Sequence, residues 1–597
     1  MKTISEPSLS ARRGAGAQQG FTLIELLALC LLVTAADAAG CHIWTITDTR
    51  HVLRSEQPGA GLAVKLGAAR NDWVSFQVLL RSDKPVAGID VKAGDLKGPG
   101  GAVLPGAAAR LYREHQLYLE TGTYRNDTFK PDWYPDPLIP FRRPPGTRGM
   151  PKARFHAVPF DLPANETHGF WIDLYVPADA AAGEYHGVYR VAAPGGRRME
   201  IPVSLTVWDF TLPRTPTLVT AFGSPADRMR SYYRQRAREG KGPGPSDWTA
   251  VEEQCAQLLS ENCINASPPS RMLRPVAHPD GTFGIPAAQI QALRKFVDLY
   301  HVNALQVPHP STVVNDPDKQ RGRLRAWLAA FDRAARELAR PQVVFYTYLK
   351  DEPNTLADYR YVRKWGPAIR EARSVVKVLV VEQTWTAPGQ GGADSAWGNL
   401  YGAVDIWCPL FSLYHHDSAA RRQALGETIW TYTALCQGPP TPWWHIDYPL
   451  LNYRVPAWMA WRDGMKGLLY WGGMSYWRQT PDPWLQAPIY TGNGRPQQGK
   501  RGIVFNGEGS LVYPARAVGY AGIVPTIRLK AVREGIEDYE FLTIARRRGK
   551  GAEAERIVRR LTESWFQWDK DPDAYDKARA ELAALIVSKN GSAMNPR

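Results

Sequence analysis

Two adjacent carboxylates follow a short apolar run and are the residues best placed for acid–base chemistry. Residues 342–350 are rich in β-branched and aromatic side chains, and the run leads into Asp351, Glu352 and Pro353. A buried strand that delivers acids at its carboxyl end, just before a helix, is how α/β barrels present catalytic groups. Position alone leaves a second interpretation open, because an acid ahead of the helix predicted for 355–373 could instead cap its free N–H groups.

Because the two acids are adjacent in the chain, they can serve only some of the known mechanisms of acid–base hydrolysis. In ordinary retaining glycosidases two carboxyls from separate elements lie about 5 Å apart, whereas neighbours on one strand point to different sides. Such a pair suits substrate-assisted hydrolysis, in which the 2-acetamido oxygen of the sugar attacks the anomeric carbon. Glu352 would protonate the leaving oxygen and later activate water, and Asp351 would orient the acetamido N–H and stabilise the oxazolinium-like intermediate.

The surrounding pattern predicts a multidomain β plus α/β fold. Short alternating segments within 42–212 indicate a β-sandwich, and from 213 to 524 apolar strands alternate with amphipathic helices. The eight predicted strands are 218–222, 263–266, 303–307, 343–349, 376–382, 404–408, 427–433 and 467–471. This order favours a (β/α)8 TIM-type barrel over a doubly wound sheet, and no Gly-rich phosphate fingerprint follows the first strand. The charged helical segment 525–597 is expected to close and cover the barrel.

Several predicted strands end on side chains that could grip a sugar. Each aromatic ring could equally be core, because the inward-facing residues of a barrel are packed. The predicted substrate-binding residues are Tyr348, Trp385, Trp407, Tyr432, Trp471, Trp477 and Asn506, and Glu382, His445, Asp447, Tyr448 and Arg454 are further candidates for polar contacts.

The charge and the motifs of the chain limit the kinds of partner that it is expected to bind. The 597 residues carry a formal charge of +15 but no zinc-finger spacing or RNA-binding aromatic motif, so a glycan and not a nucleic acid is the expected partner. The triplet His415-His416-Asp417 has no second set of ligands at metal-binding spacing and is interpreted as a loop, so neither a metal nor a cofactor is expected. The six cysteines lack a CxxC pair, and Cys255 and Cys263 are expected to be buried thiols because the segment between them looks helical and would hold them too far apart for a disulfide.

The first 41 residues are interpreted as an export leader. Gly20-Phe-Thr-Leu-Ile-Glu25 resembles a type IV prepilin leader, Ala36-Asp37-Ala38 resembles a signal peptidase site, and Ala38-Ala39-Gly40-Cys41 is a weak lipobox. All three indicate an exported protein, periplasmic, at the cell surface or extracellular, with possible membrane anchoring through this segment. A cytoplasmic protein with a misassigned start is the alternative.

Motifs spread along the chain resemble glycoside hydrolase family 123 and the related domain of unknown function 4091. The most specific are Tyr348-Leu-Lys-Asp-Glu-Pro353 and Arg533-Glu-Gly-Ile-Glu-Asp-Tyr-Glu540. The others are Asn71-Asp-Trp-Val-Ser-Phe-Gln77, Tyr134-Pro-Asp-Pro-Leu138, Val404-Asp-Ile-Trp407 and Asn506-Gly-Glu-Gly-Ser-Leu-Val-Tyr-Pro514. The resemblance implies a β-sandwich, a (β/α)8 catalytic domain and β-N-acetylgalactosaminidase chemistry, with Asp351 stabilising the acetamido group and Glu352 as acid/base.

Two rival functions remain open on the sequence. A hydrolase of another glycoside would keep Glu352 as the acid but need a separate nucleophile, for which Glu382 or Asp447 is a candidate. A carbohydrate-binding or surface protein that does not catalyse hydrolysis would keep the fold but not the activity.

Overall fold

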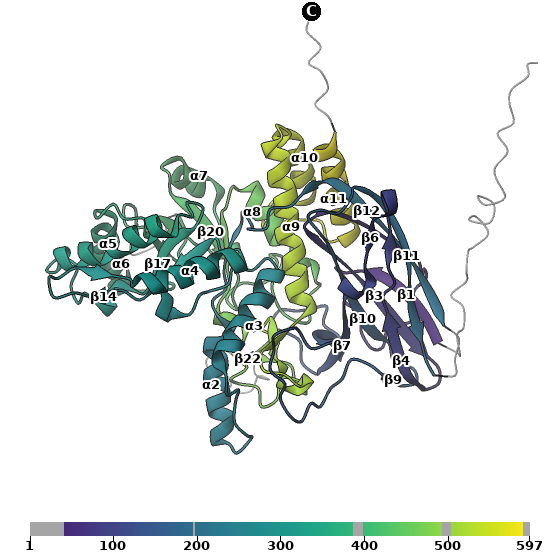
Figure 1. Cartoon of the computed structure of the whole chain (residues 1–597). Helices are drawn as coiled ribbons and strands as arrows, with labels where there is room; N and C mark the ends of the chain where they lie inside the picture. The colour runs from purple at the N-terminus through teal and green to yellow at the C-terminus, as the bar shows by residue number, and fades with distance from the viewer. Residues whose placement is uncertain (1–40, 195–197, 386–397, 492–502, 589–597) are drawn as a thin grey trace, which may run out of the picture.

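The computed structural model describes residues 41–194, 198–385, 398–491 and 503–588. The predicted leader lies outside these residues, except for Cys41, which opens the first strand. Figure 1 shows a strand-rich unit beside an α/β unit, with the long helix α9 (Ile527–Arg547) running between them. A mixed β and α/β protein of several domains is therefore confirmed.

The strand-rich unit contains two sheets around one apolar core. The first sheet has the order β1 (Cys41–Thr47), β3 (Asp72–Ser82), β10 (His168–Val176), β7 (Arg110–Leu119) and β8 (Asp132–Pro140). The second has the order β2 (Val64–Arg70), β12 (Met199–Thr211), β11 (Gly183–Ala192), β4 (Val86–Lys92) and β9 (Phe160–Leu162), with β5 (Leu96–Lys97) and β6 (Val103–Leu104) attached. Because side chains alternate along a strand, Phe76, Val78 and Leu80 of β3 enter this core.

The α/β unit is built on seven parallel strands among the described residues. Their order is β13 (Val219–Ala221), β21 (Gly467–Leu469), β20 (Thr428–Tyr432), β19 (Ile406–Trp407), β18 (Lys377–Val380), β17 (Val344–Lys350) and β16 (Ala304–Gln306). The two outer strands, β13 and β16, lie near each other, so the sheet is almost closed. A complete eight-stranded barrel is not observed in the part of the chain that the structure describes.

Asn265 bridges the gap between β13 and β16, with its side chain bonded to the β16 side and its backbone N–H to the β13 side. The sequence predicts a strand at 263–266, but no strand is assigned there. Instead, Asn265 Nδ2 donates to the Ala304 carbonyl at 3.0 Å, and Asn265 Oδ1 accepts from the N–H groups of Asn303 and Ala304 at 3.0 and 3.3 Å. On the other side its backbone N–H donates to Thr220 Oγ1 at 2.7 Å. The amide side chain of Asn265 thus makes hydrogen bonds to β16 that the backbone of the predicted strand 263–266 would otherwise make.

Helices cover the outside of this sheet. Those between its strands are α2 (Pro225–Arg238), α3 (Trp248–Glu261), α4 (Ala287–Tyr300), α5 (Arg321–Leu338), α6 (Leu356–Arg370), α7 (His416–Ala424) and α8 (Leu451–Arg462). Their apolar sides join one large core with α9, α10 (Gly551–Leu561) and α11 (Pro572–Val587). No helix of the described residues is long and apolar enough to cross a bilayer.

The C-terminal helices connect the two units. The helix α9 packs on α8 on one side and near strands β3 and β8 on the other. Arg533 and Lys530 of α9 pair with Asp173 of β10, while Arg579 of α11 pairs with Asp72 of β3. These charges are nearly or fully buried, so each needs its partner to offset the loss of hydration. The motif of residues 533–540 therefore contributes to the contact between domains.

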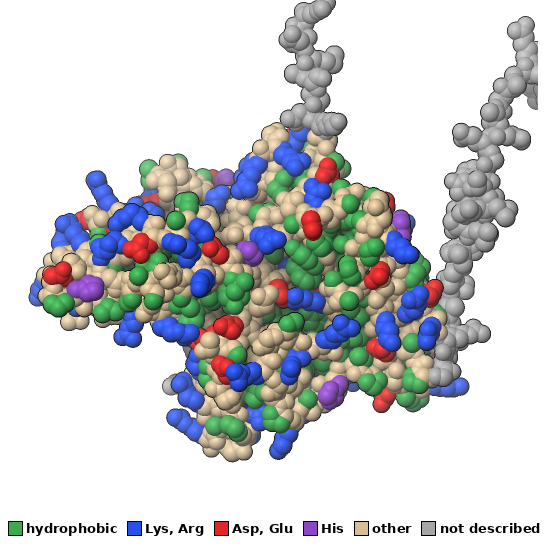
Figure 2. All heavy atoms as spheres, viewed as in Figure 1, with side chains coloured by type: hydrophobic (Ala, Val, Ile, Leu, Met, Phe, Trp, Pro, Cys, Tyr) green, Lys and Arg blue, Asp and Glu red, His purple; other side chains and the backbone are tan. Residues whose placement is uncertain are grey.

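On the face drawn in Figure 2 the positive charge is dispersed. Figure 2 shows Lys and Arg side chains scattered among acidic and apolar ones over this face, without a single large basic patch.

Candidate active site

Asp351 and Glu352 follow β17 at the carboxyl edge of the parallel sheet. Asp351 is exposed and Glu352 half-buried. Glu352 has a φ of +36°, which few residues other than glycine adopt. A strained backbone of this kind costs about 1–3 kcal/mol and is commonly found at functional sites. The chain thus turns sharply at the second acid.

Neither acid caps the following helix. The cap of α6 is Thr355, whose Oγ1 accepts from the Asp358 N–H at 3.1 Å, and Asp358 in turn pairs with Lys350 at 2.5 Å. With the helix start satisfied by other groups, the capping interpretation of the acid pair is wrong.

Each carboxylate instead receives a tyrosine hydroxyl. Tyr348, on the same strand, donates to Asp351 Oδ1 at 2.8 Å. Tyr432 donates to Glu352 Oε1 at 2.5 Å from the end of β20, which lies three strands away from β17 in the sheet. Tyr432, Trp430 and Tyr346 belong to the apolar cluster inside the sheet. Glu352 therefore extends over the mouth of the barrel-like sheet.

The two phenols remain protonated donors at neutral pH. Burial, followed by the Asp351 charge, raises the pKa of Tyr348 far above its usual range. Burial, followed by the Glu352 charge, does the same to the pKa of Tyr432. Both hydroxyls thus donate to the carboxylates and orient them.

Half-buried aromatic rings lie at the end of the last strand. Trp471 follows β21, and its ring centroid is 5.0 Å from that of Tyr476 and 5.6 Å from that of Tyr490. Trp385, beyond β18, is 4% exposed and donates its indole N–H to the Leu413 carbonyl. The structure thus places Tyr348 and Tyr432 in the last residues of strands β17 and β20, and Trp471 and Trp385 beyond the carboxyl ends of β21 and β18.

Two predicted sugar-binding residues lie elsewhere. Alternation along β19 puts Ile406 inside the sheet and Trp407 outside, where its indole N–H donates to Glu427 Oε2 at 2.7 Å, before the start of β20. Trp477 is 1% exposed, packs on Tyr232 and donates to the Val512 carbonyl. Both rings are core residues here, because the side of the strand or loop from which each projects faces the helices.

The candidates Asn506 and Asp447 fasten a loop of the sandwich unit to the barrel-like unit. Asn506 Nδ2 donates to the Thr121 carbonyl at 2.9 Å. Asp447 Oδ2 and Oδ1 accept from the backbone N–H and hydroxyl of Thr123 at 2.7 and 2.6 Å, and Asn126 Nδ2 also donates to Asp447. With both oxygens of Asp447 occupied, a nucleophilic role for that residue is disfavoured.

The other polar candidates lie among buried groups. Arg454 pairs with Asp538 and Asp576 in the contact between domains, far along the chain from the acid pair. Glu382 is 5% exposed beyond β18, and Tyr448 donates to the Arg125 carbonyl at 3.4 Å.

Glu508 is a buried carboxyl in the motif of residues 506–514 and was not among the predicted site residues. It is 1% exposed, accepts the indole N–H of Trp471, and has Oε2 3.6 Å from His445 Nδ1. Burial raises the pKa of Glu508 to about 8, whereas hydrogen bonding to Trp471 and the charge of Arg528 act in the opposite direction. The feature of the sequence that could have indicated Glu508 is its position between two glycines, Gly507 and Gly509.

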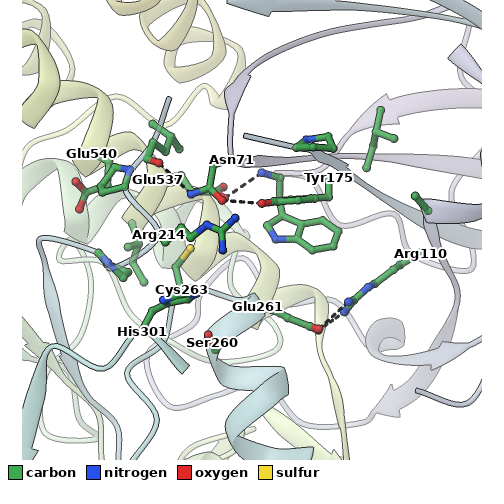
Figure 3. Close-up of a pocket in the computed structure, with 18 of the residues that line it drawn as sticks. Asn71, Arg110, Tyr175, Arg214, Ser260, Glu261, Cys263, His301, Glu537 and Glu540 are labelled. Atoms are coloured by element: carbon green, nitrogen blue, oxygen red, sulfur yellow. Dashed lines mark hydrogen bonds and ion pairs between the residues drawn. The ribbon is translucent and has the colours of Figure 1, made fainter. Parts of the chain in front are cut away.

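A cavity of about 370 Å³ lies at the contact between the two units (Figure 3). Among its lining residues, His301 and Pro216 precede β16 and β13 and so lie at the amino edge of the sheet. The acid pair lies at the carboxyl edge. Because all seven strands are parallel, this cavity is separate from the candidate active site.

The described residues include no group of three or more ligands arranged for a metal ion. His415, predicted to lie in a loop, is the N-terminal cap of α7 and accepts from the Ser418 N–H. Cys255 is a buried free thiol as expected, whereas Cys263 is a half-buried free thiol, so the expectation of burial was wrong for Cys263.

Comparison with known proteins gives two family matches. Residues 318–545 match the model described as glycoside hydrolase 123, catalytic domain, and residues 44–193 match the glycoside hydrolase 123 N-terminal domain. No curated protein matches.

Among solved structures, a family 123 glycoside hydrolase from Clostridium perfringens, studied for glycolipid glycan hydrolysis, is 14% identical. The match covers 92% of this chain and 97% of that one, with a TM-score of 0.61, which indicates a shared fold. A family 39 glycoside hydrolase from Bacteroides cellulosilyticus WH2 is 10% identical over 80% of this chain and 82% of its own, but its TM-score of 0.29 is too low to support an argument.

Proposed function

The chain belongs to glycoside hydrolase family 123, and we propose that it removes β-linked 2-acetamido sugars of the N-acetylgalactosamine type by a retaining, substrate-assisted mechanism. The observation that carries this proposal is the arrangement of Asp351 and Glu352. They are neighbours in the chain, yet each is oriented by a separate tyrosine, and Glu352 extends over the sheet mouth. Two acids with different surroundings can perform different tasks.

In the first step the acetamido oxygen of the substrate attacks the anomeric carbon, and the glycosidic C–O bond breaks. Glu352 gives its proton to the leaving oxygen, so the aglycone departs as an alcohol. Asp351 accepts a hydrogen bond from the acetamido N–H and stabilises the positive charge of the oxazolinium ion.

In the second step water attacks the anomeric carbon from the side that the aglycone left. Glu352, now ionised, takes a proton from this water, and the acetamido oxygen leaves the anomeric carbon. The product keeps the β configuration, because each of the two displacements inverts the centre once.

A separate enzyme nucleophile is the alternative, and Glu382 is its remaining candidate. Asp447 is engaged by Thr123 and Asn126. Adjacent acids on one turn do not provide the separated pair that such a mechanism uses, which favours the assisted route.

A panel of 4-nitrophenyl β-glycosides tests the proposal. We expect release from 2-acetamido sugars alone, a loss of at least about a hundredfold in kcat for Glu352→Gln and for Asp351→Asn, and inhibition by a thiazoline analogue. The matched control is Glu371→Gln, a change in an exposed ion pair with Arg321. Turnover of the plain galactoside, abolished by Glu382→Gln, would replace this mechanism with the alternative.

We also propose that the protein is exported and that its substrate is an extracytoplasmic glycan. The leader-like sequence of residues 1–41 supports this proposal.

A further inference from the structure

We infer that Glu508 is a positioning residue for the proposed reaction: it fixes the indole of Trp471 as a wall of the sugar site beside Glu352. This inference rests on the proposed function and names a residue that the two-acid mechanism does not use.

The loop that carries Glu508 has little freedom. Gly507 and Gly509 have φ values of +80° and +69°. A Cβ on Gly509 would come within 2.9 Å of both the Trp471 ring and the Tyr476 Cβ, and one on Gly507 would meet Ile446 and Arg528. Only glycine combines this backbone conformation with such close packing. The Glu508 side chain is thus directed beneath Trp471.

The sandwich unit reinforces this loop through Arg528. The guanidinium of Arg528 donates to the carbonyls of Gly507 and Ser510 at 3.3 and 2.6 Å. The same guanidinium forms a bidentate pair with Asp136 of β8 at 2.6 and 2.9 Å. Arg528 and Asp136 are fully buried. The loop is therefore held by a charge pair whose second member lies in the other unit.

Glu508 holds Trp471 by the polar edge of its ring. The indole N–H donates to Glu508 Oε1, and the remainder of the ring packs against Tyr476 and Tyr490. Trp471 is only half-buried, so part of it stays available for contact. An aromatic face of this kind is suited to the apolar face of a sugar ring.

Trp471 and Glu352 belong to the same end of the sheet. Trp471 follows β21, which is hydrogen-bonded to β20, and Tyr432 of β20 donates to Glu352. Burial, followed by the nearby carboxyl of Glu352 and then that of Glu508, raises the pKa of Cys436, beyond β20, to about 11, so both carboxyls lie near that thiol. Fixing the indole therefore shapes the region next to the proposed acid.

The neighbourhood of Glu508 favours its neutral form. Both ring nitrogens of the fully buried His445 lack a hydrogen-bond partner among the described residues. Burial, followed by Arg528, keeps the pKa of His445 well below its usual range. A protonated Glu508 can accept from Trp471 with one oxygen and direct its O–H toward Nδ1 of the neutral imidazole, 3.6 Å away. The other titratable or charged groups near Glu508 are Arg528, Tyr453, Tyr470 and Cys436.

Kinetics of two substitutions test this role. Glu508→Met removes the acceptor at similar size and is expected to raise KM for a 4-nitrophenyl 2-acetamido glycoside about tenfold, with a smaller change in kcat. Glu508→Gln keeps an acceptor and a donor and should raise KM by no more than about threefold. Trp471→Phe should resemble Glu508→Met, and the double variant should add nothing further. An unchanged KM in Glu508→Met, or fully additive effects, would overturn the inference.

The pH dependence gives a second test. Above about pH 8 the wild-type Glu508 ionises, which changes its hydrogen bonding to Trp471, so KM should change there, and Glu508→Gln should lack this change because an amide does not titrate. The same change of KM persisting in Glu508→Gln would contradict the role. A loss of kcat in Glu508→Gln as large as in Glu352→Gln would assign Glu508 to proton transfer and also overturn it.

Fluorine NMR of protein labelled with 5-fluorotryptophan separates this inference from the proposed activity. The Trp471 signal, assigned with Trp471→Phe, should shift with a midpoint near pH 8 in the ligand-free wild type and stay constant in Glu508→Gln. This result requires no turnover, so it stands even if the enzyme prefers another sugar. A Trp471 signal insensitive to Glu508 would contradict the contact.

Discussion

Tyr432, at the end of β20, donates its hydroxyl to Glu352, which follows β17 three strands away in the same sheet. This hydrogen bond crosses the mouth of the barrel-like sheet and connects the proposed acid to the opposite wall. It also distinguishes Glu352 from its neighbour, because Asp351 is bound by Tyr348 from its own strand. The different partners of the two acids match the different tasks proposed for them.

Removal of the Tyr432 hydroxyl should lower catalysis more than binding. Tyr432→Phe keeps the buried ring but leaves Glu352 without this donor, and a small displacement of a catalytic group can cost about a hundredfold. We expect kcat to fall about 10–100-fold with KM within about threefold, measured by steady-state kinetics. The matched control Tyr414→Phe changes a tyrosine that packs on Trp565, away from the acid pair, and should leave kcat unchanged. Equal kcat in wild type and Tyr432→Phe would show that the bond does not matter for catalysis.

The pair Asp136–Arg528 should be among the most important ion pairs for stability. Both side chains are fully buried, and removing one leaves the other charge unpaired, so Asp136→Ala should cost about 3–5 kcal/mol of unfolding free energy. The exposed pair Arg340–Asp298 serves as control, and Asp298→Ala should cost less than about 1 kcal/mol. Chemical denaturation measures both. Similar small losses would mean that the buried pair is not needed to join the units.

Asn265 should be essential for the stability of the sheet at the gap between β13 and β16. Asn265→Ala removes the amide that serves Ala304 and Asn303, leaving buried backbone groups without partners, so we expect a loss of about 2–4 kcal/mol. Asn315→Ala, at an exposed position, is the control. If Asn265→Ala unfolds at the wild-type temperature, the connection between β13 and β16 does not depend on this side chain.

Stability should fall as the pH rises through the range in which Glu114 ionises. Burial raises the pKa of Glu114 from 4.5 to about 8, so between these values the folded protein binds a proton that the unfolded chain releases. The unfolding free energy should therefore decrease from about pH 4.5 to pH 8, by at most about 5 kcal/mol for this group. Glu114→Gln should flatten this slope, as followed by denaturation at several pH values. An unchanged slope would contradict a buried, protonated Glu114.

Export can be checked on the mature N-terminus. We expect the recovered protein to lack at least residues 1–20, and to begin at Phe21, Ala39 or an acylated Cys41 according to the processing route. Mass spectrometry of the N-terminal peptide distinguishes the three. A full-length chain retaining residues 1–20 in the cytoplasm would contradict export.

Much of the framework was predictable because it depends on local patterns. The run before Asp351 reads as a strand, and the observed β17 agrees within a residue at each end. Trp407 was misplaced because a two-residue strand gives no alternation from which to tell its inner from its outer side. The segment around Asn265 has the apolar character of a strand, but its hydrogen bonds come from a side chain, which no periodicity reveals. The role of Glu508 could not be predicted from the sequence, because its partner Trp471 lies 37 positions away and the two residues meet only in the folded chain.

The most direct test of the central claim is a crystal structure with a bound thiazoline analogue of a 2-acetamido sugar. We predict that Asp351 lies within hydrogen-bonding distance of the ring nitrogen that replaces the acetamido N–H, with Glu352 on the side of the missing aglycone. A ligand bound elsewhere, such as the cavity between the units, or one whose ring nitrogen points away from Asp351, would contradict substrate-assisted hydrolysis by this pair.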